Sequence, residues 1–503
     1  MLYGGIRKSF NRVGKSKASR LCIMKTTISF VLVAFLILLG SSKTDNVLII
    51  TTQPLFRNDS NSGHDKLARD IFKELIEINT TSRYGSTKAA EAMAARLKFA
   101  GFPVSDIHVI GPDPQHNNLI IRYRGNGKLK PVLFISHLDV VEALQEDWSV
   151  NPFTFLEKDG YFYGRGTTDD KCDGVSFVVS LIRLKKEGFI PNRDIIVALT
   201  ADEEAGKANG VNWLITNHRD LIDADFCINP DGGEAELKHG TPTMMTIQTS
   251  EKLYFSYRLE VKNKGGHSSL PVKDNAIYAI ASALARLANY DFPVRLNETT
   301  RKYFENIAVG ESDQVKTDIL AILRTPVDTA AVRRLAALSA YFNAMMRTTW
   351  VATMMSAGHA ENALPQSASA IINCRMLPDE SPENVMSVMK TLIADSKISV
   401  TCIDSSLVAP LSPLIENVTG PVNQIASAKW LNVNVTPFMS TGATDGLFLR
   451  LKGIRVYGVS GMFHDMDDVR AHGKDERIGV KEFYDGVDFM YRFIKALSSE
   501  TNS

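Results

Sequence analysis

The chain has 503 residues, enough for two domains, and its 44% hydrophobic and 22% charged content is ordinary for a globular enzyme. Its formal net charge of +1, from 57 Lys+Arg against 56 Asp+Glu, argues against a protein that binds polyanions. We therefore expect no nucleic-acid partner.

The N-terminus is the first predicted element and has the order of an export signal. Seven basic residues precede an uncharged apolar run from Ile28 to Leu39, which is followed by Gly40-Ser41-Ser42. This order is typical of a secretory signal, and the run is shorter than the about 20 apolar residues of a spanning helix. We expect residues 1–45 to be a signal peptide, or an uncleaved anchor that provides the only membrane contact. Translation from Met24 instead of Met1 stays open.

Helical and strand-like segments alternate from about residue 65 to 229. The expected helices are 65–79, 87–100, 174–186 and 211–217, and the expected strands are 119–123, 132–136, 195–200 and 226–229. Such alternation predicts an α/β domain in which a mixed, largely buried sheet lies between helices. In open α/β sheets the functional site lies at the ends of the strands. We expect residues 46–245 to be the first part of a catalytic domain.

The pattern changes near residue 246. The expected elements are a strand at 253–262, a helix at 275–289, a long helical stretch at 299–346, strands at 349–356 and 368–376, a helix at 382–395 and a strand at 399–404. This order is typical of a split βαβ, ferredoxin-like fold with helices on one face. We predict an inserted α+β lid or dimerisation domain at 246–408, with a helical insertion, and the second part of the catalytic domain at 409–503.

Polar side chains that can bind metal follow several apolar runs. They are His137, Asp169, Glu203, Glu204, Asp231 and His472. Nitrogen and oxygen ligands suit zinc, and one carboxylate can bridge two metals about 3.5–4 Å apart. Taken singly, each residue has a commoner structural explanation, such as a turn or a helix cap. The series of segments predicts a hydrolytic metalloenzyme.

Two of these positions have competitors. Asp170 competes with Asp169 as the bridging carboxylate, and one of the two would cap the following helix. His464 competes with His472.

The neighbours of the candidate ligands also have expected roles. We expect the Asp139 carboxylate to accept a hydrogen bond from the His137 imidazole and so fix its tautomer. Because adjacent side chains diverge, one of Glu203 and Glu204 can ligate a metal while the other serves as general base.

Eight short motifs in order give the chain a resemblance to a known family. They are HLD, GRG-x-x-D, DEE, PDGG, GGHSS, NCR, ATD and HG-x-DE, between about Asp65 and the C-terminus. The chain resembles the co-catalytic zinc exopeptidases, which include aminoacylases, carnosinases, carboxypeptidase G and carboxypeptidase S. Its long helical stretch resembles the carboxypeptidase S-like and N-acyl-amino-acid hydrolase branch.

The resemblance implies a role for each residue of the site. Asp169 would bridge two Zn²⁺, or Co²⁺ or Mn²⁺ in their place; His137 and Asp231 would complete one ion, and Glu204 and His472 the other. Glu203 would be the general base, and His267 would polarise the scissile carbonyl in the active site of a partner subunit. Arg375 would bind the substrate carboxylate, with Asn275, Asn362 and the 441–445 loop as further pocket residues.

These implied roles predict a homodimeric hydrolase, and the N-terminal signal predicts that it is exported. Its substrate would carry an amide bond beside a free carboxylate, as in a peptide C-terminus, a dipeptide or an N-acyl amino acid. One alternative is a reversible synthase and hydrolase of N-acyl amino acids with fatty acyl groups, and another is a non-catalytic metal-binding relative. A serine hydrolase is disfavoured because the sequence has no G-x-S-x-G motif.

Overall fold

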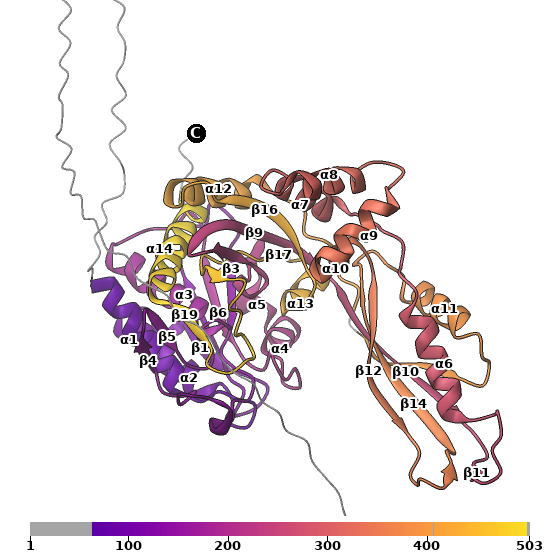
Figure 1. Ribbon diagram of the computed structural model, residues 1–503. Helices are drawn as coiled ribbons and strands as arrows, with labels where there is room; N and C mark the ends of the chain where they lie inside the picture. Colours follow the sequence, from indigo (N-terminus) through magenta and orange to yellow (C-terminus); the bar gives the residue numbers. More distant parts are fainter. Residues whose placement is uncertain (1–62, 406, 500–503) are drawn as a thin grey trace, which may run out of the picture. The chain divides into compact units, whose positions relative to one another are not determined.

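The computed structural model describes residues 63–405 and 407–499, so the predicted signal or anchor at 1–45 lies outside the described residues. Within 63–405 and 407–499, no helix is both long enough and apolar enough to cross a bilayer. Helices and strands are numbered as in Figure 1.

A six-stranded mixed sheet carries the first four predicted strands. Its order is β1 (Ile107–Ile110), β2 (Asn118–Tyr123), β6 (Ile195–Thr200), β3 (Val132–His137), β7 (Phe226–Ile228) and β17 (Arg455–Tyr457). β6, β3, β7 and β17 are parallel, and β1 and β2 are antiparallel neighbours at one edge. Every residue of β3 and β6 is buried, which explains their continuous apolar runs.

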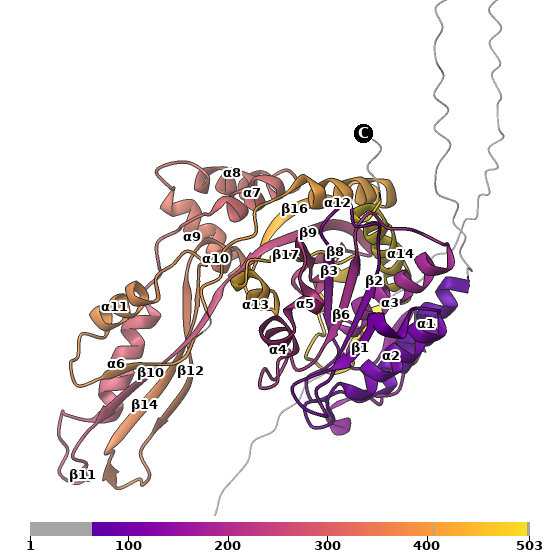
Figure 2. The ribbon, with the colours of Figure 1, turned by 180° about the vertical axis from the view of Figure 1, so that it is seen from behind.

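Helices cover both faces of this sheet (Figures 1 and 2). One layer contains α1 (Gly63–Glu77), α2 (Thr87–Phe99), α3 (Lys171–Lys186), α12 (Glu416–Lys429) and α14 (Val480–Leu497), and the other contains α4 (Gly210–Asn217), α5 (Arg219–Ile222) and α13 (Gly446–Leu451). Successive strand residues alternate between the layers. Phe134 packs against Phe177 of α3, and Ile135 belongs to the core that includes Leu214 of α4.

Two smaller sheets flank the site. One has the order β16 (Asn434–Ser440), β9 (Thr241–Glu251), β8 (Ala235–Lys238) and β18 (His464–Asp465), and the other has β19 (Arg477–Gly479), β5 (Tyr161–Tyr163) and β4 (Leu156–Lys158). The expected domain boundary after residue 245 falls inside β9, which pairs with β16 as far as Glu251.

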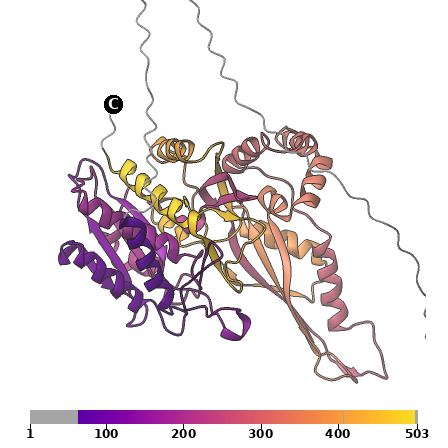
Figure 3. The ribbon, with the colours of Figure 1, turned by 60° about the vertical axis from the view of Figure 1, so that its left-hand side comes forward.

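The second predicted pattern forms a four-stranded antiparallel sheet. Its elements are β10 (Leu253–Lys262), α6 (Ala276–Ala288), β12 (Thr349–Ala357), β14 (Ser367–Met376), α11 (Pro382–Ile393) and β15 (Ser399–Ser405). The order β12-β14-β10-β15 is that of a ferredoxin-like fold. α6 and α11 lie along one face of the sheet, where Ile280 and Met389 share a core with Tyr257 (Figures 1 and 3). The predicted α/β fold with an inserted α+β sheet is confirmed.

Two further features of the inserted segment matter for the site. β11 (Gly266–His267) and β13 (Ala363–Leu364) pair beyond the end of the sheet at which Lys262 faces Ser367. The expected helical stretch forms α7 (Glu298–Ile307), α8 (Asp313–Ile322), α9 (Thr329–Leu338) and α10 (Ala340–Met346). These helices bury their apolar side chains against Phe438 of β16 and Met244 of β9, so the helical stretch packs on the β16–β9 sheet.

Candidate active site

The predicted ligands meet at one edge of the mixed sheet. His137 ends β3, Glu203 and Glu204 follow β6, and Asp231 lies in the short turn after β7. β6, β3 and β7 are parallel neighbours, so their carboxyl ends lie side by side. Asp169 precedes α3, and His472 lies in the loop between β18 and β19.

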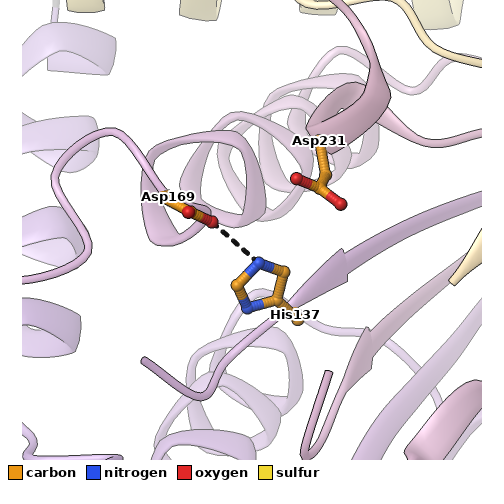
Figure 4. A group of neighbouring side chains, drawn as sticks. All are labelled: His137, Asp169 and Asp231. Atoms are coloured by element: carbon orange, nitrogen blue, oxygen red, sulfur yellow. Dashed lines mark hydrogen bonds and ion pairs between the residues drawn. The ribbon is translucent and has the colours of Figure 1, made fainter. Parts of the chain in front are cut away.

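The ligands form two groups that share one carboxylate. The first group is His137, Asp169 and Asp231, and the second is Asp169, Glu204 and His472; within each group the candidate ligand atoms lie within 4.8 Å of one another. His137 Nε2 is 3.0 Å from Asp169 Oδ1, and His472 Nε2 is 3.0 Å from Asp169 Oδ2. Figure 4 shows the side chains of the first group pointing toward one another. The two groups are therefore candidates for two neighbouring cation positions that share Asp169.

The site contains several buried carboxylates close together, and this crowding shifts their pKa values. Burial raises the pKa of Asp231 to about 8, and the negative charge of Asp169 adds to this shift. Burial also raises the pKa of Glu203 well above its usual value, with Asp231 contributing. Burial alone would raise the pKa of Asp169, but hydrogen bonds from His137 and His472 outweigh it and hold the pKa below its ordinary range. Carboxylates crowded in this way favour a bound cation, and a mixed imidazole and carboxylate donor set fits zinc.

A buried glutamate that the sequence analysis did not single out holds the loop that carries Asp169. Glu476 accepts hydrogen bonds from the backbone N–H groups of Gly166 at 3.0 Å, Thr168 at 2.7 Å and Asp169 at 3.2 Å. It also forms a buried ion pair with Arg165 at 2.8 Å. The signal was present in the HG-x-DE motif, but only the folded chain shows that this acid fixes the backbone beside Asp169.

Asp139 differs from its expected role. The Nδ1 atom of His137 hydrogen bonds to the backbone oxygen of Asp139 at 2.9 Å, and the Asp139 carboxylate lies 3.7 Å from that nitrogen. The carboxylate instead accepts the backbone N–H groups of Glu203 at 3.1 Å and Glu204 at 3.0 Å. The loop after β6 leaves these two donors without a strand partner, and Asp139 satisfies both. Asp139 therefore orients His137 through its backbone and the two glutamates through its side chain.

The two competing residues lie outside both ligand groups. Asp170 is buried, and its Oδ2 atom accepts the backbone N–H of His137 at 3.1 Å. It occupies the N-cap position of α3 without a side-chain capping bond, and its peptide bond with Asp169 is cis. His464 lies on β18, where burial lowers its pKa to about 4.

Asp445, in the predicted 441–445 loop, is a further acid close to the site. Its buried carboxylate accepts a hydrogen bond from the Asn209 amide at 2.5 Å, and its charge adds to the raised pKa of Glu203. The neighbouring Thr444 is anchored to Glu251 through its backbone and its hydroxyl, both at 3.0 Å.

Three predicted residues lie in the inserted segment, away from the ligands of the same chain. His267 is on β11, and Asn362 is beside it, because the Asn362 backbone oxygen accepts the N–H of Ser268 at 3.0 Å. β10 has 10 residues, so β11 lies about 30 Å along the sheet from the end that joins β9. Asn275 is the N-cap residue of α6. Its side-chain oxygen caps α6, with the Ile277 N–H at 2.8 Å.

Arg375 lies at the other end of this sheet, on the face opposite α6 and α11, together with Tyr254 and a buried lysine. Its guanidinium is 4.7 Å from the Tyr254 ring centre. Lys252 is 1% exposed and donates to the Thr349 hydroxyl at 3.2 Å. Burial, with the positive charge of Arg375, lowers the pKa of Lys252 to about 7. Within 63–405 and 407–499, neither cation has an ion pair with a carboxylate.

The fold is a mixed sheet between helix layers, and two candidate ligand groups of histidines and carboxylates lie at its strand ends. This combination is typical of a metallohydrolase. Residues 133–496 match the sequence model of peptidase family M20/M25/M40. The chain belongs to this family. The predicted family resemblance and the predicted class of enzyme are both confirmed.

Known relatives agree with this assignment. The chain is 27% identical over 390 residues to the N-fatty-acyl-amino acid synthase/hydrolase PM20D1 of Homo sapiens, covering 76% of this chain and 77% of that protein. It is 29% identical over 399 residues to the probable carboxypeptidase S-like 2 of Dictyostelium discoideum, covering 75% and 74%. Its fold is similar to that of the M20 family metallo-carboxypeptidase Sso-CP2 of Sulfolobus solfataricus, with a TM-score of 0.64, 18% identity and coverage of 86% and 99%.

Proposed function

We propose that this metallohydrolase uses two zinc ions to cleave amide bonds that lie beside a free carboxylate. The observation that carries the proposal is the pair of ligand groups that share Asp169. His137 and Asp231 would complete one ion, and Glu204 and His472 the other. When bound, zinc would supply Lewis acidity that polarises a carbonyl and lowers the pKa of water at the site to about 7.

Glu203 is the proposed general base. Asp139 fixes its backbone, and its carboxylate stands among the acids of the site. A raised pKa suits a group that takes a proton from the attacking water and returns it to the leaving nitrogen.

Arg375 and Lys252 together are the proposed binding site for the substrate carboxylate. The planar guanidinium group of Arg375 can donate two parallel hydrogen bonds to a carboxylate. Burial lowers its pKa, and Lys252 is its cationic neighbour. Arg375 and Lys252 are both desolvated, and neither has an acidic partner among the described residues. Such a pair favours an anionic ligand.

His267 is proposed to act in the active site of a second subunit of a homodimer. In support, β12 is an edge strand of the inserted sheet and exposes Val351, Met354 and Met355. A long edge strand with exposed apolar side chains favours pairing with another chain.

The proposed domain division rests on separate apolar cores. One core joins buried side chains between Ala68 and Ile247 with others between Val418 and Leu497. A second core uses only side chains between Leu253 and Ile398. We propose catalytic parts at 46–251 and 409–503 with the inserted domain between them, which moves the expected boundary after residue 245 to the end of β9. Export through residues 1–45 is likewise a proposal.

The direct test is the Glu203→Ala variant, with the exposed Glu91→Ala variant of α2 as control. Loss of a general base lowers kcat by about 10²–10⁴-fold. We expect this loss on N-acyl amino acids or dipeptides, with metal content unchanged from the wild type. Glu91→Ala should keep its rate. Near-native turnover by Glu203→Ala with two metals bound would contradict the assignment of the base.

A second candidate function is reversible synthesis of N-acyl amino acids from a fatty acid and an amino acid. The similarity to the human N-fatty-acyl-amino acid synthase/hydrolase favours this candidate. The same site would serve both directions, so the test is a substrate panel run from the amide and from the separate acid and amine. Product formation in the second direction at concentrations found in cells would support synthesis.

A further inference from the structure

His267 lies where the short β11–β13 ribbon of the inserted segment ends in a turn. The Ser268 N–H continues the pairing of the ribbon with the Asn362 backbone oxygen, at 3.0 Å. The chain then reverses, because the Leu270 N–H donates to the His267 backbone oxygen at 3.0 Å. His267 is therefore the first residue of a four-residue turn whose central residues are Ser268 and Ser269.

This turn brings Ser269 back against the imidazole of His267. The backbone N–H of Ser269 donates to His267 Nδ1 at 3.2 Å, and the Ser269 hydroxyl oxygen is 2.8 Å from the same nitrogen. A side chain that accepts the N–H two residues later is the arrangement of an Asx turn, here with an imidazole nitrogen as the acceptor. Both contacts lie within one turn of one subunit.

The two contacts determine which ring nitrogen of His267 carries the proton. A backbone N–H can only donate, so Nδ1 must be the acceptor and carries no proton. In a neutral imidazole the other nitrogen is then protonated, and here that nitrogen is Nε2. The Ser269 hydroxyl can donate or accept, so it donates its own proton to Nδ1 as a second hydrogen bond.

The Nε2–H group of His267 has no partner within the described part of the chain. His267 is exposed, and the printed contacts of its ring are both made by Nδ1. A free N–H donor fits the role proposed for His267, because negative charge develops on the carbonyl oxygen of the substrate during the reaction. In the opposite tautomer, Nε2 would present a lone pair to that oxygen and repel it.

The same arrangement argues against two other roles for His267. A general base must present an unprotonated nitrogen to a proton donor, and a zinc ligand must present a lone pair to the ion. The unprotonated nitrogen of His267 is Nδ1, which already faces Ser269. His267 also belongs to neither ligand group among the described residues.

We propose that Ser269 is a positioning residue that holds His267 in the Nε2–H tautomer, so that His267 donates a hydrogen bond to the substrate carbonyl in the site of the partner subunit. The inference rests on the proposed function for the step in the partner's site. His267 transfers no proton in this step. The proton of the attacking water passes to Glu203 and then to the leaving nitrogen as the C–N bond breaks.

NMR of the full chain, labelled with ¹⁵N at histidine and treated with chelator, measures the tautomer directly. Long-range ¹H–¹⁵N spectra at about pH 9, where histidine is neutral, separate protonated from unprotonated ring nitrogens. The signals that disappear in His267→Gln belong to His267. We expect a protonated Nε2 and an unprotonated Nδ1 in the wild type, and a larger share of the other tautomer in Ser269→Ala. A proton on Nδ1 in the wild type would overturn the inference.

Kinetics show whether the tautomer matters for the reaction. Ser269→Ala removes the hydroxyl donor and keeps the backbone donor, so kcat should fall about 2–10-fold, the effect of one hydrogen bond, with KM little changed. Ser269→Thr keeps the hydroxyl and should keep the rate. Ser268→Ala is the matched control, because the Ser268 hydroxyl has no hydrogen-bond partner among the described residues.

Two kinetic results would overturn the positioning role. One is a wild-type kcat in Ser269→Ala. The other is an equal fall in kcat when Ser269→Ala is added to His267→Ala, because a residue that acts through His267 has no effect once the imidazole is gone.

Mixed dimers show in which subunit Ser269 acts. In a dimer of Glu203→Ala with His267→Ala, the one complete site takes its His267 from the Glu203→Ala subunit. Adding Ser269→Ala to that subunit should lower the recovered rate, whereas adding it to the His267→Ala subunit should not, and the reverse result would overturn the inference. No turnover of any substrate by the wild type would contradict the proposed function instead, and the NMR spectra would still decide the tautomer.

Discussion

Glu476 is the residue on which the position of Asp169 depends most directly. Its carboxylate accepts the backbone N–H groups of Gly166, Thr168 and Asp169 and pairs with a buried arginine. Glu476→Gln preserves the size of the side chain but replaces one acceptor oxygen with a donor. Loss of such a supporting partner typically costs about 10–100-fold in metal affinity or activity. We expect this loss in zinc competition titrations, with part of the activity recovered at high zinc, and no change for Glu91→Gln. Unchanged zinc affinity would contradict the positioning role.

Lys252 gives a second prediction at this scale, because burial lowers its pKa to about 7. An unfolded lysine has a pKa of about 10.4, so the native state binds fewer protons than the unfolded state between these values. The free energy of unfolding therefore rises with pH in this window. Urea unfolding of chelator-treated protein at pH 7 and 9.5 should show this rise in wild type and in the exposed Lys262→Met, but less of it in Lys252→Met. Equal slopes in all three would refute the prediction.

Single residues of the site were predictable to different degrees. His137 and Asp231 stand directly after apolar runs, and that local pattern is sufficient to make them candidates. The roles of Glu476 and Lys252 depend on partners far away in the sequence, such as Gly166 and Thr349. Asp139 follows His137 closely enough in the sequence to be a candidate partner, but whether its carbonyl or its carboxylate meets the imidazole depends on where the loop after β6 lies.

At the scale of elements, the prediction concerns the inserted domain, which contains His267 on β11. If His267 acts in the site of a partner, a dimer of Glu203→Ala with His267→Ala contains one complete site. Random exchange of equal amounts makes half of the dimers mixed, so about a quarter of wild-type activity should return. Met354→Lys on the edge strand β12 should weaken the dimer and so reduce this recovery. Absence of recovery after verified subunit exchange would count against the shared site.

Elements were predictable where they are long enough to have a pattern. β10, β14, α6 and α11 lie within a few residues of their expected ranges, because alternation or helical spacing is visible over ten or more residues. β4, β5, β18 and β19 have two or three residues each, and no periodicity can be detected over such a length. β9 continues past the expected domain boundary because its pairing with β16 depends on a strand almost 200 residues later.

At the scale of the whole molecule, the candidate site is complete only when the C-terminal catalytic segment packs against the N-terminal catalytic segment. His472 contacts Asp169 and Glu204 across about 300 residues of chain. Metal held by these residues would therefore link the two catalytic segments and stabilise the native state, by about 4 kcal/mol at a free metal concentration 1,000 times the dissociation constant. Thermal unfolding should show a melting temperature several degrees lower after chelation, restored by zinc.

The same measurement separates the two candidate histidines. His472→Ala removes a ligand of the second group, so the shift in melting temperature caused by zinc should become smaller. His464→Ala should retain most of that shift, because His464 belongs to neither ligand group among the described residues. His472 has a φ of 60°, a backbone conformation that is uncommon outside glycine, so the zinc-dependent shift of each variant is measured against its own chelator-treated protein. A zinc-dependent shift that survives in His472→Ala and disappears in His464→Ala would reverse the assignment of the fifth ligand.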